Sequence, residues 1–219
     1  MDESRIKNKW PVAKEGFPFL IIGCGLTFLL AYFGALFLSF PVAAATLFVA
    51  FFFRDPDRIN YVSRKAVVAP ADGKILEVRR LEDGNNPLGQ AAIKISVFMT
   101  VFNVHVNRIP VSSVIKEVTY NPGRFFSANL DKASKYNENN RITLESHDAH
   151  KVVFVQIAGL IARRIACWVK AGDQVMAGQR FGLIRFGSRV DLFLPDDTQI
   201  SARINQKVRA GQTIIGYLS

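Results

Sequence analysis

Apolar, uncharged residues fill one long stretch near the start of the chain. From Phe17 to Phe53, 37 consecutive positions carry no charged side chain. A helix of about 20 apolar residues crosses the roughly 30 Å hydrocarbon core of a bilayer, so the stretch is too long for one such helix and just short of two. Proline disfavours helix continuation and restricts the residue before it, which marks Ser39-Phe40-Pro41 as the break. The pattern predicts a membrane hairpin of about Phe17–Leu38 and Val42–Phe53, with the second arm short or re-entrant.

Positive charge flanks this stretch on both sides, within residues 5–14 and again within residues 54–65. The positive-inside tendency would place both flanks in the cytoplasm, which a hairpin permits and a single span does not. The apolar region is too long for a cleaved signal peptide, and no small-residue cleavage site follows it. We therefore expect a basic cytoplasmic N-terminus (1–16), a membrane hairpin (17–53) and a domain (54–219) on the cytoplasmic face of the cell membrane.

Beyond Arg58 the pattern changes to short β-like runs separated by Gly, Pro, Asn and Asp. The range Ala158–Cys167 is predicted as a short helix or as the continuation of a strand, and polar Phe125–Asn140 as a long loop of the kind that is commonly functional. The soluble part is therefore expected to be mainly β, a β-sandwich or barrel-sandwich domain. The expected strands are Ala66–Val68, Lys74–Arg79, Ala92–Val97, Val111–Tyr120, Arg141–Ser146, Lys151–Ile157, Gln179–Ile184, Val190–Leu194, Gln199–Ala202 and Thr213–Tyr217.

Two segments near the C-terminus resemble each other. Val169-Lys-Ala-Gly-Asp-Gln-Val-Met-Ala-Gly-Gln179 and Val208-Arg-Ala-Gly-Gln-Thr-Ile-Ile-Gly216 both join a glycine turn to a β-branched strand. Such hairpins are typical of flattened β-sandwiches like lipoyl and biotinyl carrier domains. No lysine occupies a hairpin tip as it does in those carriers, which argues against a swinging-arm domain.

The net charge of +10 changes this picture by suggesting an anionic partner. No zinc-finger spacing or recognition-helix pattern accompanies the basic residues, so a membrane surface is favoured over nucleic acid, and no metal site is expected. Cys24 lies in the apolar stretch and Cys167 far downstream, which fits a reducing compartment better than a disulfide framework.

The pair Gly187–Ser188 interrupts what otherwise reads as one strand of alternating residues, from Leu183 to Pro195. Glycine inside a strand often marks a bulge, a bend or a close approach of the backbone to another group. The serine beside it places a potential nucleophile at this irregular point. A plain β-bulge with a surface serine is the alternative.

Three further motifs carry candidate chemistry. Ala69-Pro-Ala-Asp-Gly73 is a turn that presents Asp72, although most Asp-Gly turns are purely structural. Phe98-Met-Thr-Val-Phe-Asn-Val-His-Val-Asn-Arg-Ile-Pro110 places His105 among apolar strand residues, where a hydrogen-bonded core histidine is the alternative. Tyr120-Asn-Pro-Gly-Arg-Phe-Phe126 is a turn that leads into the polar loop.

In this order, the motifs resemble those of the phosphatidylserine decarboxylase proenzyme family. The resemblance runs from about residue 30 to the C-terminus, and its five motifs are individually weak but jointly specific. The matching segments are Phe51-Phe-Phe-Arg-Asp-Pro56, which resembles the short subgroup of the family, Pro70-Ala-Asp-Gly73, Val104-His-Val-Asn-Arg-Ile-Pro110, Asn121-Pro-Gly123 and Phe186-Gly-Ser188.

The resemblance implies a self-processing enzyme. Ser188 Oγ would attack the carbonyl carbon of Gly187, with His105 as the base and Asp72 orienting it, as in a hydrolase triad. Elimination and hydrolysis would leave a β chain (1–187) and an α chain (188–219) that begins with a pyruvoyl group, the two associating as a heterodimer. This covalent cofactor would form a Schiff base with the amine of phosphatidylserine and accept electrons as carbon dioxide leaves. Phosphatidylethanolamine would be the product.

One position departs from the family pattern. Larger members have two histidines, three positions apart, in the segment that matches Val104–Pro110, and here the second position is Arg108. His105 would then serve both in self-cleavage and in protonation of the decarboxylated product.

Two other functions remain open from the sequence. One is a pyruvoyl decarboxylase that acts on another amino-acid-derived lipid or on a soluble amine, of which the anchor disfavours the soluble case. The other is a membrane-tethered, non-enzymatic β-sandwich adaptor, which would carry long coiled-coil heptads that this chain lacks.

Overall fold

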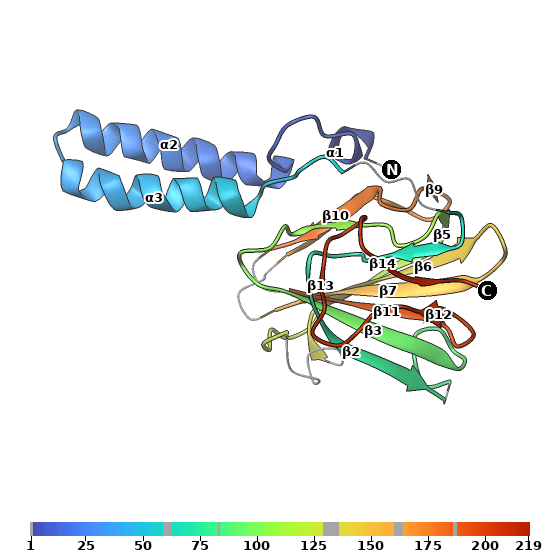
Figure 1. Ribbon diagram of the computed structural model, residues 1–219. Helices are drawn as coiled ribbons and strands as arrows, with labels where there is room; N and C mark the ends of the chain where they lie inside the picture. Colours follow the sequence, from blue (N-terminus) through green and yellow to red (C-terminus); the bar gives the residue numbers. More distant parts are fainter. Residues whose placement is uncertain (1, 59–62, 83, 129–135, 160–163, 186–187) are drawn as a thin grey trace. The chain divides into compact units, whose positions relative to one another are not determined.

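The structure, a computed structural model, describes residues 2–58, 63–82, 84–128, 136–159, 164–185 and 188–219 (Figure 1). The chain divides into two compact units. One is a helical hairpin within Asn8–Asp57, and the other is a β unit formed by Met1–Lys7 together with Arg58–Ser219. The change from one unit to the other coincides with the change from uncharged apolar sequence to short β-like runs.

The hairpin unit contains η1 (Lys14–Gly16), α2 (Phe17–Tyr32) and α3 (Leu36–Phe52). The predicted break at Ser39-Phe40-Pro41 is wrong, because Pro41 lies inside α3 and the turn lies at residues 33–35. Proline lacks one N–H and so costs α3 one hydrogen bond near its start, but it does not end the helix.

Gly34 explains where the turn falls. Its φ of +76° lies in the left-handed region, which glycine adopts without steric cost. The Gly34 amide donates to the Ala31 carbonyl at 3.1 Å, and the Ala35 amide donates to the Leu30 carbonyl at 2.9 Å. These paired bonds are the Schellman arrangement that terminates helices at a glycine. The chain therefore reverses at its glycine rather than at its proline.

The open end of the hairpin is closed by hydrogen bonds between its two flanks. Asn8 Nδ2 donates to Asp55 Oδ2 at 3.1 Å, and the Ala13 amide donates to the Phe53 carbonyl at 2.8 Å. Residues on either side of the helical pair therefore lie side by side, as a hairpin requires.

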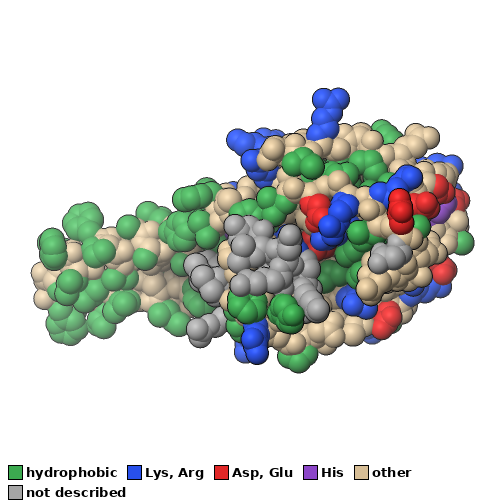
Figure 2. Space-filling view, turned by 90° about the horizontal axis from the view of Figure 1, so that it is seen from below, with side chains coloured by type: hydrophobic (Ala, Val, Ile, Leu, Met, Phe, Trp, Pro, Cys, Tyr) green, Lys and Arg blue, Asp and Glu red, His purple; other side chains and the backbone are tan. Residues whose placement is uncertain are grey.

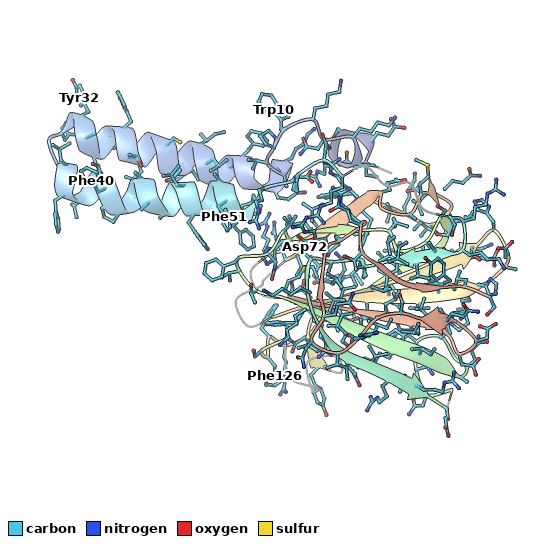
Figure 3. All side chains as sticks on the ribbon, viewed as in Figure 1. Trp10, Tyr32, Phe40, Phe51, Asp72 and Phe126 are labelled. Atoms are coloured by element: carbon cyan, nitrogen blue, oxygen red, sulfur yellow. The ribbon has the colours of Figure 1, made fainter. Side chains whose placement is uncertain are left out.

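The outer surface of the hairpin is apolar. No residue of α2 is buried, and Figure 2 shows hydrophobic side chains along the helices. Tyr32 and Phe40 lie toward the closed end (Figure 3). In the described chain, Lys14–Tyr32 is long and apolar enough to cross a bilayer, while α3, with 17 residues, is shorter. At 1.5 Å per residue α3 spans about 25 Å, somewhat less than a hydrocarbon core.

The β unit is built on an eight-stranded antiparallel sheet. Strands from the end of the chain are inserted among earlier ones, since β11 lies between β3 and β7. In order across the sheet the strands are β13 (Lys207–Val208), β2 (Gly73–Leu81), β3 (Ala92–Met99), β11 (Ser188–Pro195), β7 (Lys151–Ala158), β6 (Asn139–Ser146), β5 (Ser113–Asn121) and β9 (Gln174–Val175).

Two three-stranded sheets complete this unit, together with the short helix α1 (Glu3–Ile6). One contains β1 (Ala66–Val68), β14 (Ile214–Tyr217) and β12 (Gln199–Ile200), and the other β4 (Val106–Arg108), β10 (Arg180–Ile184) and β8 (Ile165–Cys167). Phe154 on β7 and Phe181 on β10 are fully buried and pack edge to face at 4.8 Å. The β4–β10–β8 sheet therefore packs against one face of the large sheet, and the expected mainly-β class is confirmed.

Each expected strand overlaps an observed one, and the short strands β4, β8, β9 and β13 were not predicted as such. The helix predicted for Ala158–Cys167 is wrong at both described ends, because Ala158 ends β7 and Ile165–Cys167 is β8. Residues 160–163 of that range, and 129–135 of the expected loop, lie outside the described residues. Both copies of the glycine-turn echo form turns, with Gly172 and Gly211 at φ of +87° and +71°.

Candidate active site

Ser188 is the first residue of β11 and lies at a junction between two sheets. β10 ends at Ile184 in the small sheet, whereas β11 pairs Ser188 with Met99 and Ala158 in the large one. The alternative of a plain β-bulge is therefore wrong, because the segment joins two strands of different sheets. Gly187 lies outside the described residues.

Ser188 is also fully buried, which excludes the surface-serine alternative. Its Oγ lies 3.8 Å from Met99 Sδ, and a thioether sulfur is a weak acceptor. The hydroxyl is thus held away from solvent, and among the described residues this sulfur is its only hydrogen-bond partner.

His105 lies just before β4 and is fully buried as well. Its Nδ1 is 3.0 Å from the Asn103 carbonyl oxygen, which can only accept a hydrogen bond. In a neutral imidazole, Nδ1 must then carry the proton, and Nε2 is left as the basic nitrogen. The His105 carbonyl also accepts a hydrogen bond from the Ile184 amide at 3.4 Å, which ties the histidine segment to the end of β10.

Asp72 is held by a different set of bonds. Arg58 Nη1 and Nη2 donate to its two carboxylate oxygens at 2.5 and 2.8 Å, and the Ala210 amide donates to Oδ1 at 2.7 Å. A hydrolase-type triad would have this carboxylate on the histidine Nδ1, where the structure has the Asn103 carbonyl. The role of Asp72 as the residue that orients His105 therefore stays a prediction.

Gly73 brings Asp72 close to the end of β3. Its φ is +149°, and a Cβ at this position would collide with the Phe98 carbonyl oxygen. Only glycine allows the two backbones to approach this closely. The Asp72 turn and the Phe98–Asn103 segment, which leads to His105, therefore share one edge of the β unit.

A cavity of about 490 Å³ opens at this edge. Asp72 and Asn103 line it, together with three cations on two neighbouring strands or their ends: Lys74, Lys207 and Arg209. These three side chains are exposed and form no ion pair within the described residues. Because Asp72 is neutralised by Arg58, the cavity is positive and suits an anionic group.

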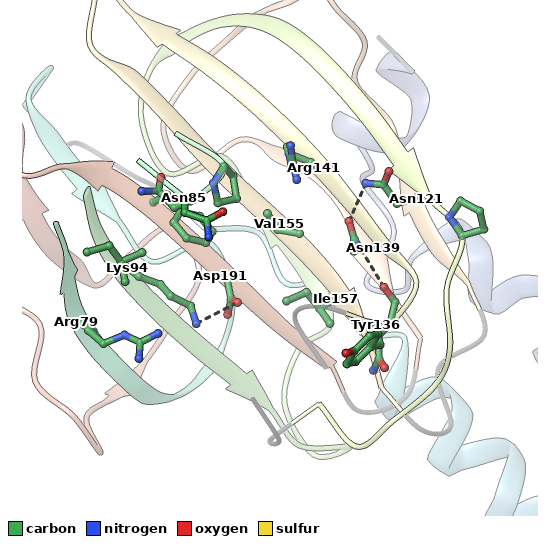
Figure 4. A pocket seen from close by; sticks show the side chains of 16 residues that line it. Arg79, Asn85, Lys94, Asn121, Tyr136, Asn139, Arg141, Val155, Ile157 and Asp191 are labelled. Atoms are coloured by element: carbon green, nitrogen blue, oxygen red, sulfur yellow. Dashed lines mark hydrogen bonds and ion pairs between the residues drawn. The ribbon is translucent and has the colours of Figure 1, made fainter. Parts of the chain in front are cut away.

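The opposite face of β11 carries a chain of charges, of which Figure 4 shows the Lys94–Asp191 pair. Arg189 Nε is 2.8 Å from Asp191 Oδ1, and Lys94 Nζ lies 3.7 Å from Asp191 Oδ2 and 2.7 Å from Glu77 Oε2. Burial acts to raise the pKa of Glu77, but the hydrogen bond and charge of Lys94, with the charge of Arg79, outweigh it and lower the pKa. The alternation of residues predicts that Arg189 and Asp191 lie on the polar side of a strand. It does not reveal that this side is buried.

Within the described residues, no group of three or more His, Cys, Asp or Glu side chains is arranged to hold a metal ion.

Comparison with known proteins decides the family. The family model described as phosphatidylserine decarboxylase matches residues 45–216, most of the chain. The chain belongs to the phosphatidylserine decarboxylase family. It is therefore an enzyme, and the alternative of a non-enzymatic adaptor is wrong.

Relatives named phosphatidylserine decarboxylase proenzyme match nearly the whole chain. The protein of Desulfotalea psychrophila is 47% identical over 208 residues, covering 95% of this chain and 97% of its own length. The protein of Syntrophus aciditrophicus is 48% identical, with 94% and 96% covered, and that of Geotalea uraniireducens 44%, with 98% and 99% covered. These relatives include the hairpin region as well as the β unit.

Arg108, which stands where larger members of the phosphatidylserine decarboxylase family have a second histidine, is buried. Its Nη1 donates to the Gly178 carbonyl at 2.9 Å, and its Cδ packs close to Gly211. The Arg108 side chain thus contacts both segments of the sequence echo, Gly178 in the first and Gly211 in the second. Asn107, the residue before Arg108, contacts the Met99 sulfur that also contacts Ser188. The sequence did not single out Asn107 as a candidate.

Proposed function

We propose that this chain is a self-processing decarboxylase that converts phosphatidylserine to phosphatidylethanolamine. The observation that carries the proposal is Ser188, a fully buried serine at the first position of a central strand, in a chain of the phosphatidylserine decarboxylase family. A buried hydroxyl whose partner among the described residues is a weakly accepting sulfur suits a nucleophile that acts once on its own backbone.

In the proposed cut, Ser188 Oγ attacks the carbonyl carbon of Gly187, and the peptide becomes an ester. His105 Nε2 accepts the hydroxyl proton, because Nδ1 is held as a donor by the Asn103 carbonyl. Elimination then releases the carboxylate of residue 187 and leaves dehydroalanine at 188. Hydrolysis of that group releases ammonia and leaves a pyruvoyl group at the start of residues 188–219.

The surroundings of residue 188 fit a pyruvoyl group. The group is made from Ser188 itself, so it needs no binding residues beyond those that already enclose the serine. It supplies a ketone that reacts with the substrate amine and accepts electrons as carbon dioxide leaves. Burial excludes water from this position, and His105, also fully buried, would hold or return a proton at Nε2.

The positive cavity and the hairpin support a lipid substrate. Lys74, Lys207 and Arg209 suit the phosphodiester of phosphatidylserine, whose net charge is negative. The apolar helices suit a membrane anchor, and the basic flanks favour the cytoplasmic side. We propose that the matured β and α chains stay together as a heterodimer anchored in the cell membrane.

The test is the intact mass of the purified full-length protein. We expect two chains, 1–187 and 188–219, with the second blocked to N-terminal sequencing, and release of carbon dioxide from phosphatidylserine. The Ser188→Ala variant should remain a single chain and inactive. Ser113→Ala, which alters a buried serine in β5 of the same sheet, is the matched control and should be processed normally. A Ser188→Ala protein that is still cut would overturn the proposal.

A further inference from the structure

Three buried side-chain amides lie on the Ser188 face of the sheet and have no part in the proposed function so far. Asn140 Nδ2 donates to Gln156 Oε1 at 3.0 Å, and Gln156 Nε2 donates to Asn107 Oδ1 at 2.9 Å. Asn107 Nδ2 in turn lies 3.5 Å from Met99 Sδ. Asn107 and Gln156 are fully buried, and Asn140 is 2% exposed. The amides therefore form a directed chain across β6, β7 and β4 that ends at a sulfur atom.

That sulfur fixes the direction of the chain. A thioether can accept a hydrogen bond but cannot donate one, so the Asn107 nitrogen must face Met99. The Asn107 oxygen is then used by Gln156, and the Gln156 oxygen by Asn140. Each amide holds the next in one orientation, and the last one points a donor at Met99.

The use of this donor is unusual for a protein interior. Buried donors generally have strong oxygen acceptors, because an unsatisfied amide costs free energy. Within the described residues, the sulfur is the only acceptor for Asn107 Nδ2. Ser188 Oγ contacts the same sulfur at 3.8 Å. A pre-aligned donor and the proposed nucleophile thus contact the same sulfur atom.

We propose that Asn107 donates the hydrogen bond that stabilises negative charge during self-cleavage. The inference rests on the proposed function. When Ser188 Oγ bonds to the carbonyl carbon of residue 187, the former carbonyl oxygen becomes an oxyanion on that same carbon. It therefore forms within two bonds of Oγ, and Oγ shares its contact with Met99 Sδ with Asn107 Nδ2. Exchange of a sulfur acceptor for an oxyanion strengthens the bond, and the stabilisation is specific to the transition state.

Gln156 and Asn140 act in this scheme as positioning residues. Gly182, which pairs with Asn107 across β4 and β10, leaves room for Gln156, because a Cβ there would lie 3.2 Å from Gln156 Nε2. The amide chain is thereby enclosed by backbone and held in one arrangement before the reaction begins. Such fixed donors need no reorganisation when charge develops.

The experiment follows the appearance of the 188–219 fragment with time, by intact mass, in full-length protein made by cell-free synthesis with vesicles. Asn107→Leu keeps the approximate volume and removes the donor, and processing should slow by about 10²-fold, as expected for loss of one oxyanion donor. Asn139→Leu is the matched control: it removes a side-chain amide on the opposite face of β6, outside the amide chain, so its rate should stay within a few fold of wild type.

Asn107→Asp provides a readout that a structural role would not change. Its side chain can donate only when protonated, so its processing rate relative to wild type should rise as the pH falls. A constant ratio across pH, or wild-type processing in Asn107→Leu, would overturn the inference. If Ser188→Ala were itself cut, the proposed function would fail; if Ser188→Ala is blocked while Asn107→Leu is normal, only the role of Asn107 fails.

Discussion

The proton on the imidazole of His105 is placed by a backbone group. A side-chain substitution does not remove the Asn103 carbonyl, because that carbonyl belongs to the backbone. The turn at residues 100–103 therefore sets the tautomer of His105. In this turn Asn103 Oδ1 accepts a hydrogen bond from the Thr100 amide at 2.9 Å. A histidine held in this way is ready as a base without a carboxylate at Nδ1. The Asn103 carbonyl thus holds His105 Nδ1, and the orienting role of Asp72 stays a prediction.

Replacement of His105 tests its role as the base. His105→Ala should block processing, because a serine hydroxyl is a weak nucleophile without a positioned base. Intact mass after prolonged incubation measures the uncut fraction. His150→Ala, a half-buried histidine at the turn between β6 and β7, is the control and should be processed fully. Normal cutting in His105→Ala would assign the base to another group.

Two substitutions distinguish the role of Asp72 from that of Arg58. Asp72→Ala should block processing, and it should also lower the free energy of unfolding by about 3–5 kcal/mol, because it leaves the buried Arg58 guanidinium without its carboxylate. Arg58→Met breaks the same pair from the other side. Both are measured in the uncut Ser188→Ala background for stability and in the wild-type background for processing.

The outcome distinguishes two roles. If Asp72 acts only by fixing the turn beside β3, both substitutions should slow processing in proportion to their loss of stability. If the carboxylate acts directly on the reacting groups, Asp72→Ala should be blocked while Arg58→Met is still cut. Processing of Asp72→Ala at the normal rate would show that Asp72 has no role in self-cleavage.

At the scale of elements, two glycines with positive φ are expected to differ in their sensitivity to a methyl group. Gly73→Ala should cost about 3 kcal/mol of stability, since its Cβ would collide with the Phe98 carbonyl of the neighbouring strand. Gly172→Ala, with φ of +87° and open space around it, should cost only about 1–2 kcal/mol. Urea unfolding of the uncut proteins compares them; equal losses would contradict the close approach of β2 and β3.

The charge chain of β2, β3 and β11 makes stability depend on acidity. The folded pKa of Glu77 is lowered from 4.5, so its contribution is complete above the unfolded value and is lost as the pH falls through the folded value. Glu77→Gln should therefore reduce stability near neutral pH and flatten its fall below about pH 4.5. Thermal midpoints across pH 3–7, with exposed Glu117→Gln as the control, measure the difference in slope.

Much of this element structure could be predicted because strands follow local rules. β1 was predicted with its observed ends, since Gly, Pro and polar residues bound it. The junction at Ser188 was not, because alternation of residues continues from β10 into β11 while the chain passes between sheets. The hairpin turn was misplaced because Pro41 was given more weight than Gly34, although proline is tolerated near a helix start.

The proposed site also has a part that the sequence could suggest and a part that it could not. Ser188, His105 and Asp72 could be proposed because their motifs lie in order along the sequence. Asn107, Gln156 and Asn140 come from three separate strands, and only pairing of those strands brings their amides together. A buried asparagine in a strand is no signal in a single sequence, so this part of the site required the structure.

For the whole molecule, the hairpin and the β unit should be separable in function. Replacement of residues 14–53 by a short Gly/Ser linker should leave processing intact, because the flanks that it joins lie side by side. Binding to vesicles that contain phosphatidylserine should be lost, and activity on those vesicles should fall by about 10²-fold as the effective substrate concentration drops. Sedimentation and carbon dioxide release measure the two effects.

An unrelated apolar helical hairpin at the same position serves as the control and should restore both properties. Activity on phosphatidylserine in detergent micelles should be similar in all three proteins. Full binding of the linker protein to vesicles would place the membrane contact in the β unit instead.

The position of β11 between β3 and β7 has a consequence for the lifetime of the enzyme. Strands on either side of the proposed cut are interleaved, so the mature heterodimer was assembled while its chain was still continuous. Once cut, a molecule that unfolds releases a short fragment into solution and loses the connection that guided its assembly. Heat should therefore inactivate the mature enzyme permanently, while the uncut Ser188→Ala precursor recovers its fold on cooling. Maturation would make each molecule active at the cost of its ability to be repaired.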